Sequence, residues 1–195
     1  MLAAGSWRGN SPRRPREVTA KTARNPLSTA ASVVAMVLPD EIIRAAHRGE
    51  LQPVVKWLRK GGHVDALAEN GDRLLHFAVA GGSLRVAKEL LQRGDSIDLR
   101  GAVGGTALMM AAGLGRHAMV RLLLEHKASV DLRNDHRMTA LIVAACEGHT
   151  ECVQELLAAG ASTELRDKNG ITALQVAERT GHSATAKLLR QHAAA

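Results

Sequence analysis

The side chains of this 195-residue chain that could support catalysis or metal binding are nine histidines and two cysteines. Cys146 and Cys152 lie six residues apart, with Gly148 and His149 between them. This spacing differs from the paired ligand spacing of structural zinc sites, so we expect no metal site and two free thiols. Free thiols are typical of a reducing compartment, and we therefore expect an intracellular protein, cytoplasmic or nuclear.

The acidic side chains also give no sign of an active site. Asp65, Asp98, Asp131 and Glu164 follow one another at a constant interval, as expected of loop positions and not of groups that converge on one substrate. The glycine-rich stretch 101–105 lacks the Gly-Lys-Ser/Thr sequence of a phosphate-binding loop. We predict no catalytic residues, no cofactor and no enzymatic activity.

The elements that position these residues repeat along the chain. A leucine or isoleucine column, a small-residue column and a glycine column recur with the same period, which indicates one structural unit used several times. A single unit of this size cannot bury its own apolar face, so neighbouring units must complete one another in a stack. The three columns are Ile42, Leu75, Leu108, Leu141 and Leu174; Ala45, Ala78, Ala111, Ala144 and Ala177; and Gly49, Gly82, Gly115, Gly148 and Gly181.

Within one unit, the pattern predicts two short helices and an extended connection. Thr106 can cap a first helix that continues to about Ala112, and Gly115 allows the chain to reverse at positive φ. Apolar residues at helical spacing over 120–124 predict the second helix, and the segment 128–132 leads to the next unit.

Three short motifs make the chain resemble the ankyrin repeat family over roughly residues 40–192. The fourth unit carries them as Thr139-Ala140-Leu141 at a helix start, Gly148-His149 at the turn and Gly160-Ala161 at the exit. The resemblance implies an all-α solenoid of about five stacked helix-turn-helix units joined by short hairpin loops. It also implies that His149 and His182 tie neighbouring units together, and that His76 belongs to a helix-start motif. Departures from the pattern are the missing proline before each leucine, Arg73 in place of threonine and Lys127 in place of the exit glycine.

The chain divides into a basic tail, residues 1–38, and a repeat domain, residues 39–195. The tail has a net charge of +5 and three prolines, which predicts a disordered extension. An organellar targeting segment within residues 1–35, or a physiological start at Met36, agrees with the same residues. No apolar run reaches the roughly 18 residues of a membrane-spanning helix. The predicted units cover about residues 40–66, 68–100, 101–133, 134–166 and 167–192.

The function expected from the resemblance is protein binding through the concave face of the stack, by a monomeric scaffold or adaptor that is not an enzyme. Mixed charge across the repeats argues against nucleic-acid binding by this domain. Alternatively, the basic tail could bind nucleic acid or an anionic membrane and tether the protein. Val103, Leu114 and Met138 form an apolar centre within a charged rim, which is typical of an interface. The candidate protein-binding residues are Glu69, Asn70, Asp72, Val103, Leu114, Asp135, His136, Met138, Glu147, Lys168 and Ile171.

Overall fold

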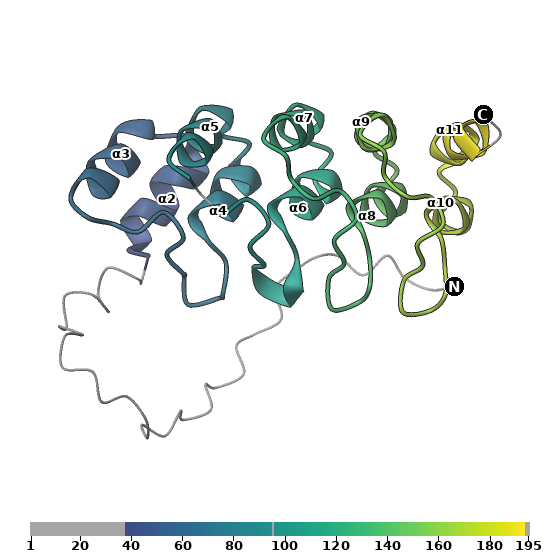
Figure 1. Ribbon diagram of the computed structural model, residues 1–195, viewed down its shortest axis with the longest axis horizontal. Coiled ribbons are helices and arrows are strands. Elements are labelled where there is room, and N and C mark those ends of the chain that lie inside the picture. The colour runs from purple at the N-terminus through teal and green to yellow at the C-terminus, as the bar shows by residue number, and fades with distance from the viewer. Residues whose placement is uncertain (1–37, 95, 194–195) are drawn as a thin grey trace, which may run out of the picture.

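The computed structural model describes residues 38–94 and 96–193, and these fold into a row of helix pairs (Figure 1). The prediction of an all-α stack of helix-turn-helix units is confirmed. The proposed tail lies outside the described residues except for Leu38, which is buried and donates its backbone N–H to the carbonyl of Leu67 at 2.9 Å. The helices are α2 Asp40–Arg48, α3 Leu51–Arg59, α4 Leu74–Gly81, α5 Leu84–Gln92, α6 Ala107–Gly113, α7 His117–Glu125, α8 Ala140–Glu147, α9 Thr150–Ala158, α10 Ala173–Thr180 and α11 Ser183–Ala193, with a 3₁₀ turn, η1, at Ala102–Gly104.

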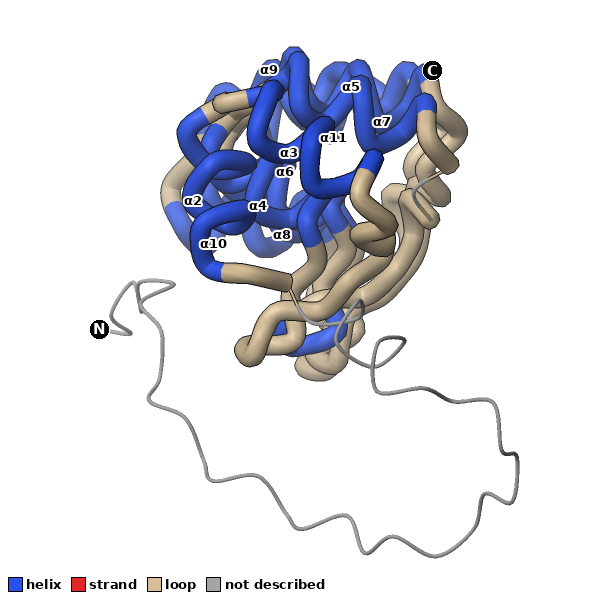
Figure 2. The backbone as a smooth tube through the Cα atoms, turned by 90° about the vertical axis from the view of Figure 1, so that its left-hand side faces the viewer, coloured by secondary structure: helices blue, strands red, loops and turns tan. Residues whose placement is uncertain are grey.

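The helices form two parallel rows. The first helices, α2, α4, α6, α8 and α10, each contact the next along an inner row, and the second helices, α3, α5, α7, α9 and α11, form an outer row. The loops that join one unit to the next project below the inner row (Figure 2). The stack thus presents an outer helical face and, on the other side, an inner face bounded by first helices and hairpins.

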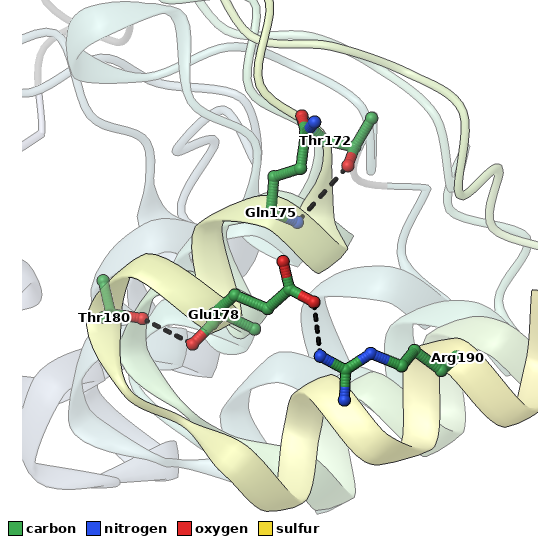
Figure 3. Close-up of polar contacts among 6 residues, drawn as sticks. Thr172, Gln175, Glu178, Thr180 and Arg190 are labelled. Carbon is green, nitrogen blue, oxygen red and sulfur yellow. Dashed lines mark hydrogen bonds and ion pairs between the residues drawn. The ribbon is translucent and has the colours of Figure 1, made fainter.

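Threonine side chains start three of the first helices. Thr106, Thr139 and Thr172 each accept a hydrogen bond at Oγ1 from the N–H three residues later, at 3.3–3.4 Å. These bonds satisfy backbone donors that the helix itself cannot pair. Figure 3 shows the bond between Thr172 and Gln175 in α10, beside the ion pair that links Glu178 of α10 to Arg190 of α11.

In the second unit, which has no threonine cap, a histidine makes a different hydrogen bond at the start of the first helix. Arg73 precedes α4, and its backbone N–H donates to Nδ1 of His76 at 3.4 Å. Nε2 of the same ring lies 3.3 Å from the carbonyl of Gly105, which it can pair with as the N–H donor. His76 therefore links the start of α4 to the hairpin of the next unit.

Aliphatic and small side chains fill the space between the two rows. Aromatic residues make up 2% of the chain, so the core depends on Leu, Val, Ile, Met and Ala. The alanine column from Ala45 to Ala177 is at most 3% exposed, and these small side chains let neighbouring first helices approach closely. Leu90, Leu123, Leu156 and Leu189 occupy one buried column of the second helices, each 2% exposed or less.

A ladder of hydrogen bonds joins each unit to the one before it, and we call it the turn ladder. At the start of α5, α7, α9 and α11, one side chain reaches back to a carbonyl at the end of the first helix of the preceding unit. The donors are chemically different while the acceptor position is the same. The pairs are Ser83 with His47 at 3.4 Å, Arg116 with Ala80 at 2.6 Å, His149 with Gly113 at 3.2 Å and His182 with Cys146 at 3.0 Å.

The glycine column is what makes room for this ladder. Gly148 has φ 75°, a left-handed conformation that glycine adopts without strain. A Cβ at this position would come within 2.4 Å of Nδ1 of His182. The glycine therefore provides both the chain reversal and the space in which the next unit's histidine reaches its carbonyl.

The acid column forms a second ladder on the other side of the units. Asp65, Asp98 and Asp131 each accept a hydrogen bond from the backbone N–H of a serine 31 residues later, at 3.0–3.1 Å. This structural role agrees with the prediction that these carboxylates are loop positions of the repeat.

We expect His149→Ala to lower the free energy of unfolding by about 1–2 kcal/mol, because the carbonyl of Gly113 loses its donor between two packed units. Urea unfolding followed by circular dichroism measures the change. His192→Ala is the matched control, since His192 is exposed at the end of α11 and outside the ladder. An equal loss in the two variants would contradict the assignment.

Candidate functional site

Most of the predicted binding residues are exposed on hairpins or at the ends of first helices. Three of the eleven, Asp72, Met138 and Ile171, are half-buried. The other eight are exposed: Glu69 and Asn70 in the second unit, Val103 and Leu114 in the third, Asp135, His136 and Glu147 in the fourth, and Lys168 in the fifth.

Hydrogen bonds connect neighbouring hairpins into a continuous row. The N–H of Asp135 donates to the carbonyl of Val103 at 3.3 Å, and the N–H of Lys168 donates to the carbonyl of His136 at 3.0 Å. Between the second and third units, Oδ1 of Asp72 accepts from the N–H of Ala102 at 2.9 Å instead. The side chains at the tips are therefore held on a backbone that is already ordered.

The carboxylate of Asp72 is committed to this structural role. Its Oδ1 binds the backbone of Ala102, and its Oδ2 accepts from the side-chain amide of Asn70 at 3.0 Å. The nearby His76 is buried, and burial lowers its pKa, although the negative charge of Asp72 acts in the opposite direction. Asp72 shapes the hairpin, and each of its carboxylate oxygens already accepts one hydrogen bond within the stack.

The predicted apolar centre is divided by the fold. Val103 and Leu114 are 50% and 49% exposed, whereas Met138 packs against the core. Val103 also has φ 56°, a left-handed conformation that is unfavourable for a β-branched residue. Two large apolar side chains of the third unit are thus available to a partner, one at the hairpin and one just after α6.

The hairpins of the last two units present two cations, Lys168, which was predicted from the sequence, and Arg137, which was not. Arg137 is exposed and has φ 58°, at the position that Gly71, Gly104 and Gly170 occupy in the other units. Nζ of Lys168 lies 2.8 Å from Nδ1 of His136 on the neighbouring hairpin. An arginine in a column of glycines was the signal that could have identified this position.

Two members of the turn ladder were not predicted from the sequence. Only His149 and His182 were expected to tie units together, while Ser83 and Arg116 make the same connection. All four residues occupy the same position in successive units, directly after the glycine column, so the repeat period alone could have assigned them.

The two thiols are poor nucleophiles. Burial raises the pKa of Cys146, with a smaller contribution from Glu147. Burial also raises the pKa of Cys152 to about 11, and this side chain is fully buried. Both cysteines are free thiols. Because the thiolate is the reactive form, this environment does not activate either cysteine.

Across residues 38–94 and 96–193, no three His, Cys, Asp or Glu side chains come together in a way that could hold a metal ion. Within the same described residues, no helix has the length and apolar character needed to span a bilayer.

A family model described as ankyrin repeats, in 3 copies, matches residues 42–134 and 127–195. These matches cover the stack from the first helix to the last. No curated protein matches the chain.

We expect the stability of the protein to fall as the pH drops below about 6.5, the ordinary pKa of histidine, because unfolded His76 then binds a proton that the folded site resists. The loss per pH unit reaches at most about 1.4 kcal/mol between 6.5 and the lower folded pKa. We expect the His76→Gln variant to lose this pH dependence. The urea concentration at the midpoint of unfolding, measured at about pH 7.5 and 5.5, checks this expectation. His192→Gln should keep the wild-type slope, and a wild-type slope in His76→Gln would contradict the prediction.

We expect Cys152 in a Cys146→Ser variant to react with Ellman's reagent about a hundredfold more slowly in the native protein than in urea at about pH 8. A pKa of about 11 leaves little thiolate at that pH, and the folded stack covers the sulfur. The absorbance of the coloured thiolate that the reagent releases gives the reaction rate and tests this expectation. Rapid reaction of the folded protein would show that the second helices open readily.

Proposed function

The chain belongs to the ankyrin repeat family, and we propose that it is a non-enzymatic adaptor that binds a partner protein through the concave face of its stack. Ankyrin repeats are generally protein–protein interaction modules and typically lack catalytic activity. In this proposal residues 39–195 form the binding domain of a monomeric protein.

The observation that supports this proposal best is the exposure of Val103 and Leu114 on an ordered framework. Each is about half exposed. The hairpin that carries Val103 is hydrogen-bonded to the next hairpin, and α6 is held between α4 and α8. Little conformational entropy is then lost when a partner covers these side chains, which favours affinity.

The polar groups around this centre provide orientation. Glu69 lies on the hairpin of the second unit, whereas His136, Arg137 and Lys168 lie on the hairpins of the fourth and fifth units. A partner with complementary charge would be steered to one orientation along the stack. We therefore propose a partner surface with an apolar centre, and with acidic groups facing the last two hairpins.

We expect the double variant Val103→Asn, Leu114→Thr to weaken partner binding by at least about tenfold without unfolding the stack. Asparagine tolerates the left-handed conformation of Val103 better than valine does, and threonine occupies the position of Leu114 in the last unit as Thr180. Affinity capture with the full chain, followed by titration of each captured protein, measures the effect.

The matched control is Leu67→Ser, which removes a side chain of similar exposure, 42%, that belongs neither to the candidate residues nor to the outer helices. Capture that survives the double variant, or an equal loss in the double variant and the control, would contradict binding at the concave face. Capture that depends only on the basic residues of the tail would support tethering through the tail instead.

A further inference from the structure

A hollow of about 250 Å³ lies on the outer face, between α5 and α7. Leu84 of α5 and Ala118 and Leu122 of α7 provide its apolar surface, and Leu84 is 41% exposed. Arg85 and Lys88 line it from α5. The two helices lie next to each other in the outer row (Figure 1), and this face is turned away from the hairpins (Figure 2).

We propose that this hollow is a second docking site, which binds an acidic polypeptide segment through one large apolar side chain.

The hollow exists because α7 departs from its neighbours at two positions. Where α7 has Leu122, α5 and α9 have Glu89 and Glu155, and where it has Ala118, they have Arg85 and Glu151. Helix α7 therefore has short or apolar side chains at the two positions where both adjacent helices extend long charged ones. The result is an apolar depression on a surface that is otherwise polar.

The charges next to the hollow favour an acidic partner. Arg85 and Lys88 are exposed, and the ion pairs found within residues 38–94 and 96–193 include neither of them. Arg121, also at the rim, is paired with Glu155 of α9. Glu125 lines the α7 side of the hollow, so the uncompensated positive charge lies on the α5 side.

The next outer helix extends this positive region. Helix α3, Leu51–Arg59, adds Lys56 and Arg59 and contains no acidic residue. Helix α9 contributes Glu151 and Glu155 on the opposite side of the hollow. Carboxylates of a bound segment would consequently lie over α5 and α3, away from α9.

The size and lining of the hollow identify the partner as a polypeptide. Its volume is below the roughly 300–1,000 Å³ of small-molecule pockets, and it fits a side chain whose backbone continues over the flat surface outside. No aromatic side chain lines it for the stacking of nucleic-acid bases. An anionic membrane is contacted by apolar side chains that protrude, whereas this apolar surface is recessed between two helices.

A site on the outer row adds a second interaction to the proposed adaptor. The hollow lies on α5 and α7, and these helices and the hairpins are on opposite sides of the stack (Figure 2), so one molecule could hold two proteins at once. Neither site requires the other.

The test is selection of random peptides of roughly 12 residues, long enough to present positions i, i+4 and i+7, on the immobilised full chain. Peptides that also bind a Leu122→Glu variant are removed. This variant carries the residue that α5 and α9 have at the same position, so it should fold. We expect the remaining peptides to combine Leu, Met or Phe with several Asp or Glu. A selection that yields no such peptides overturns the proposal.

Selected peptides are then synthesised with a fluorescent label and titrated against charge variants. We expect Arg85→Gln, Lys88→Gln to reduce affinity by about tenfold or more, and affinity to fall as salt rises from about 0.05 to 0.5 M. Lys187→Gln is the matched control, because Lys187 occupies the position of Lys88 on α11. Equal losses in the double variant and the control overturn the proposal.

Two further probes test whether a different class of anion binds in the hollow. An oligothymidylate and vesicles that contain phosphatidylserine are titrated against the wild type and the Leu122→Glu variant. Tighter binding of either probe than of the selected peptides, with loss in Leu122→Glu, would assign the hollow to that anion and overturn the peptide proposal. The variant Val103→Asn, Leu114→Thr should retain peptide binding, which separates failure here from failure of the proposed concave site.

Discussion

The structure depends on hydrogen bonds that one unit can complete only with the next. Near the end of each of the helices α2, α4, α6 and α8, a carbonyl accepts a hydrogen bond from a side chain of the following unit. The carboxylates of Asp65, Asp98 and Asp131 bind backbone donors of the following unit in the same way. Because both the polar groups and the apolar faces are satisfied between neighbours, stability arises from stacking and not from any single unit.

The turn ladder tolerates chemically different donors because the geometry of the acceptor is constant. A serine hydroxyl, an arginine guanidinium and two imidazoles reach equivalent carbonyls. The neighbouring glycines leave the space that these side chains occupy, as the close approach of Gly148 to His182 shows. The repeat is thus preserved by backbone positions and small residues, while the donor side chain can vary.

The two proposed binding surfaces arise where the chain departs from its own repeat. Val103 replaces a polar residue at the tip of a hairpin, Arg137 replaces a glycine, and Leu122 replaces a glutamate on the outer row. Val103 and Arg137 are exposed, whereas Leu122 is half-buried and also packs against the core. Exposed apolar residues and strained backbone positions of this kind are commonly associated with binding. The scaffold keeps such positions in place because neighbouring units on both sides hold each helix pair.

The sequence by itself determined the architecture of the stack. Its constant repeat period, the threonine caps and the glycine turns are local features whose physical effects do not depend on distant parts of the chain. It also placed the candidate binding residues on hairpins and helix ends.

Only the tertiary structure decided which of these candidate residues are available to a partner. Val103, Leu114 and Met138 are alike in the sequence, but Met138 packs against the core and Asp72 binds the next hairpin. The hollow beside Leu122 likewise exists only because α5 and α7, which are separated in the chain, lie side by side. Exposure and hydrogen bonding at these positions are set by the neighbouring unit, so a pattern read within one unit does not contain them.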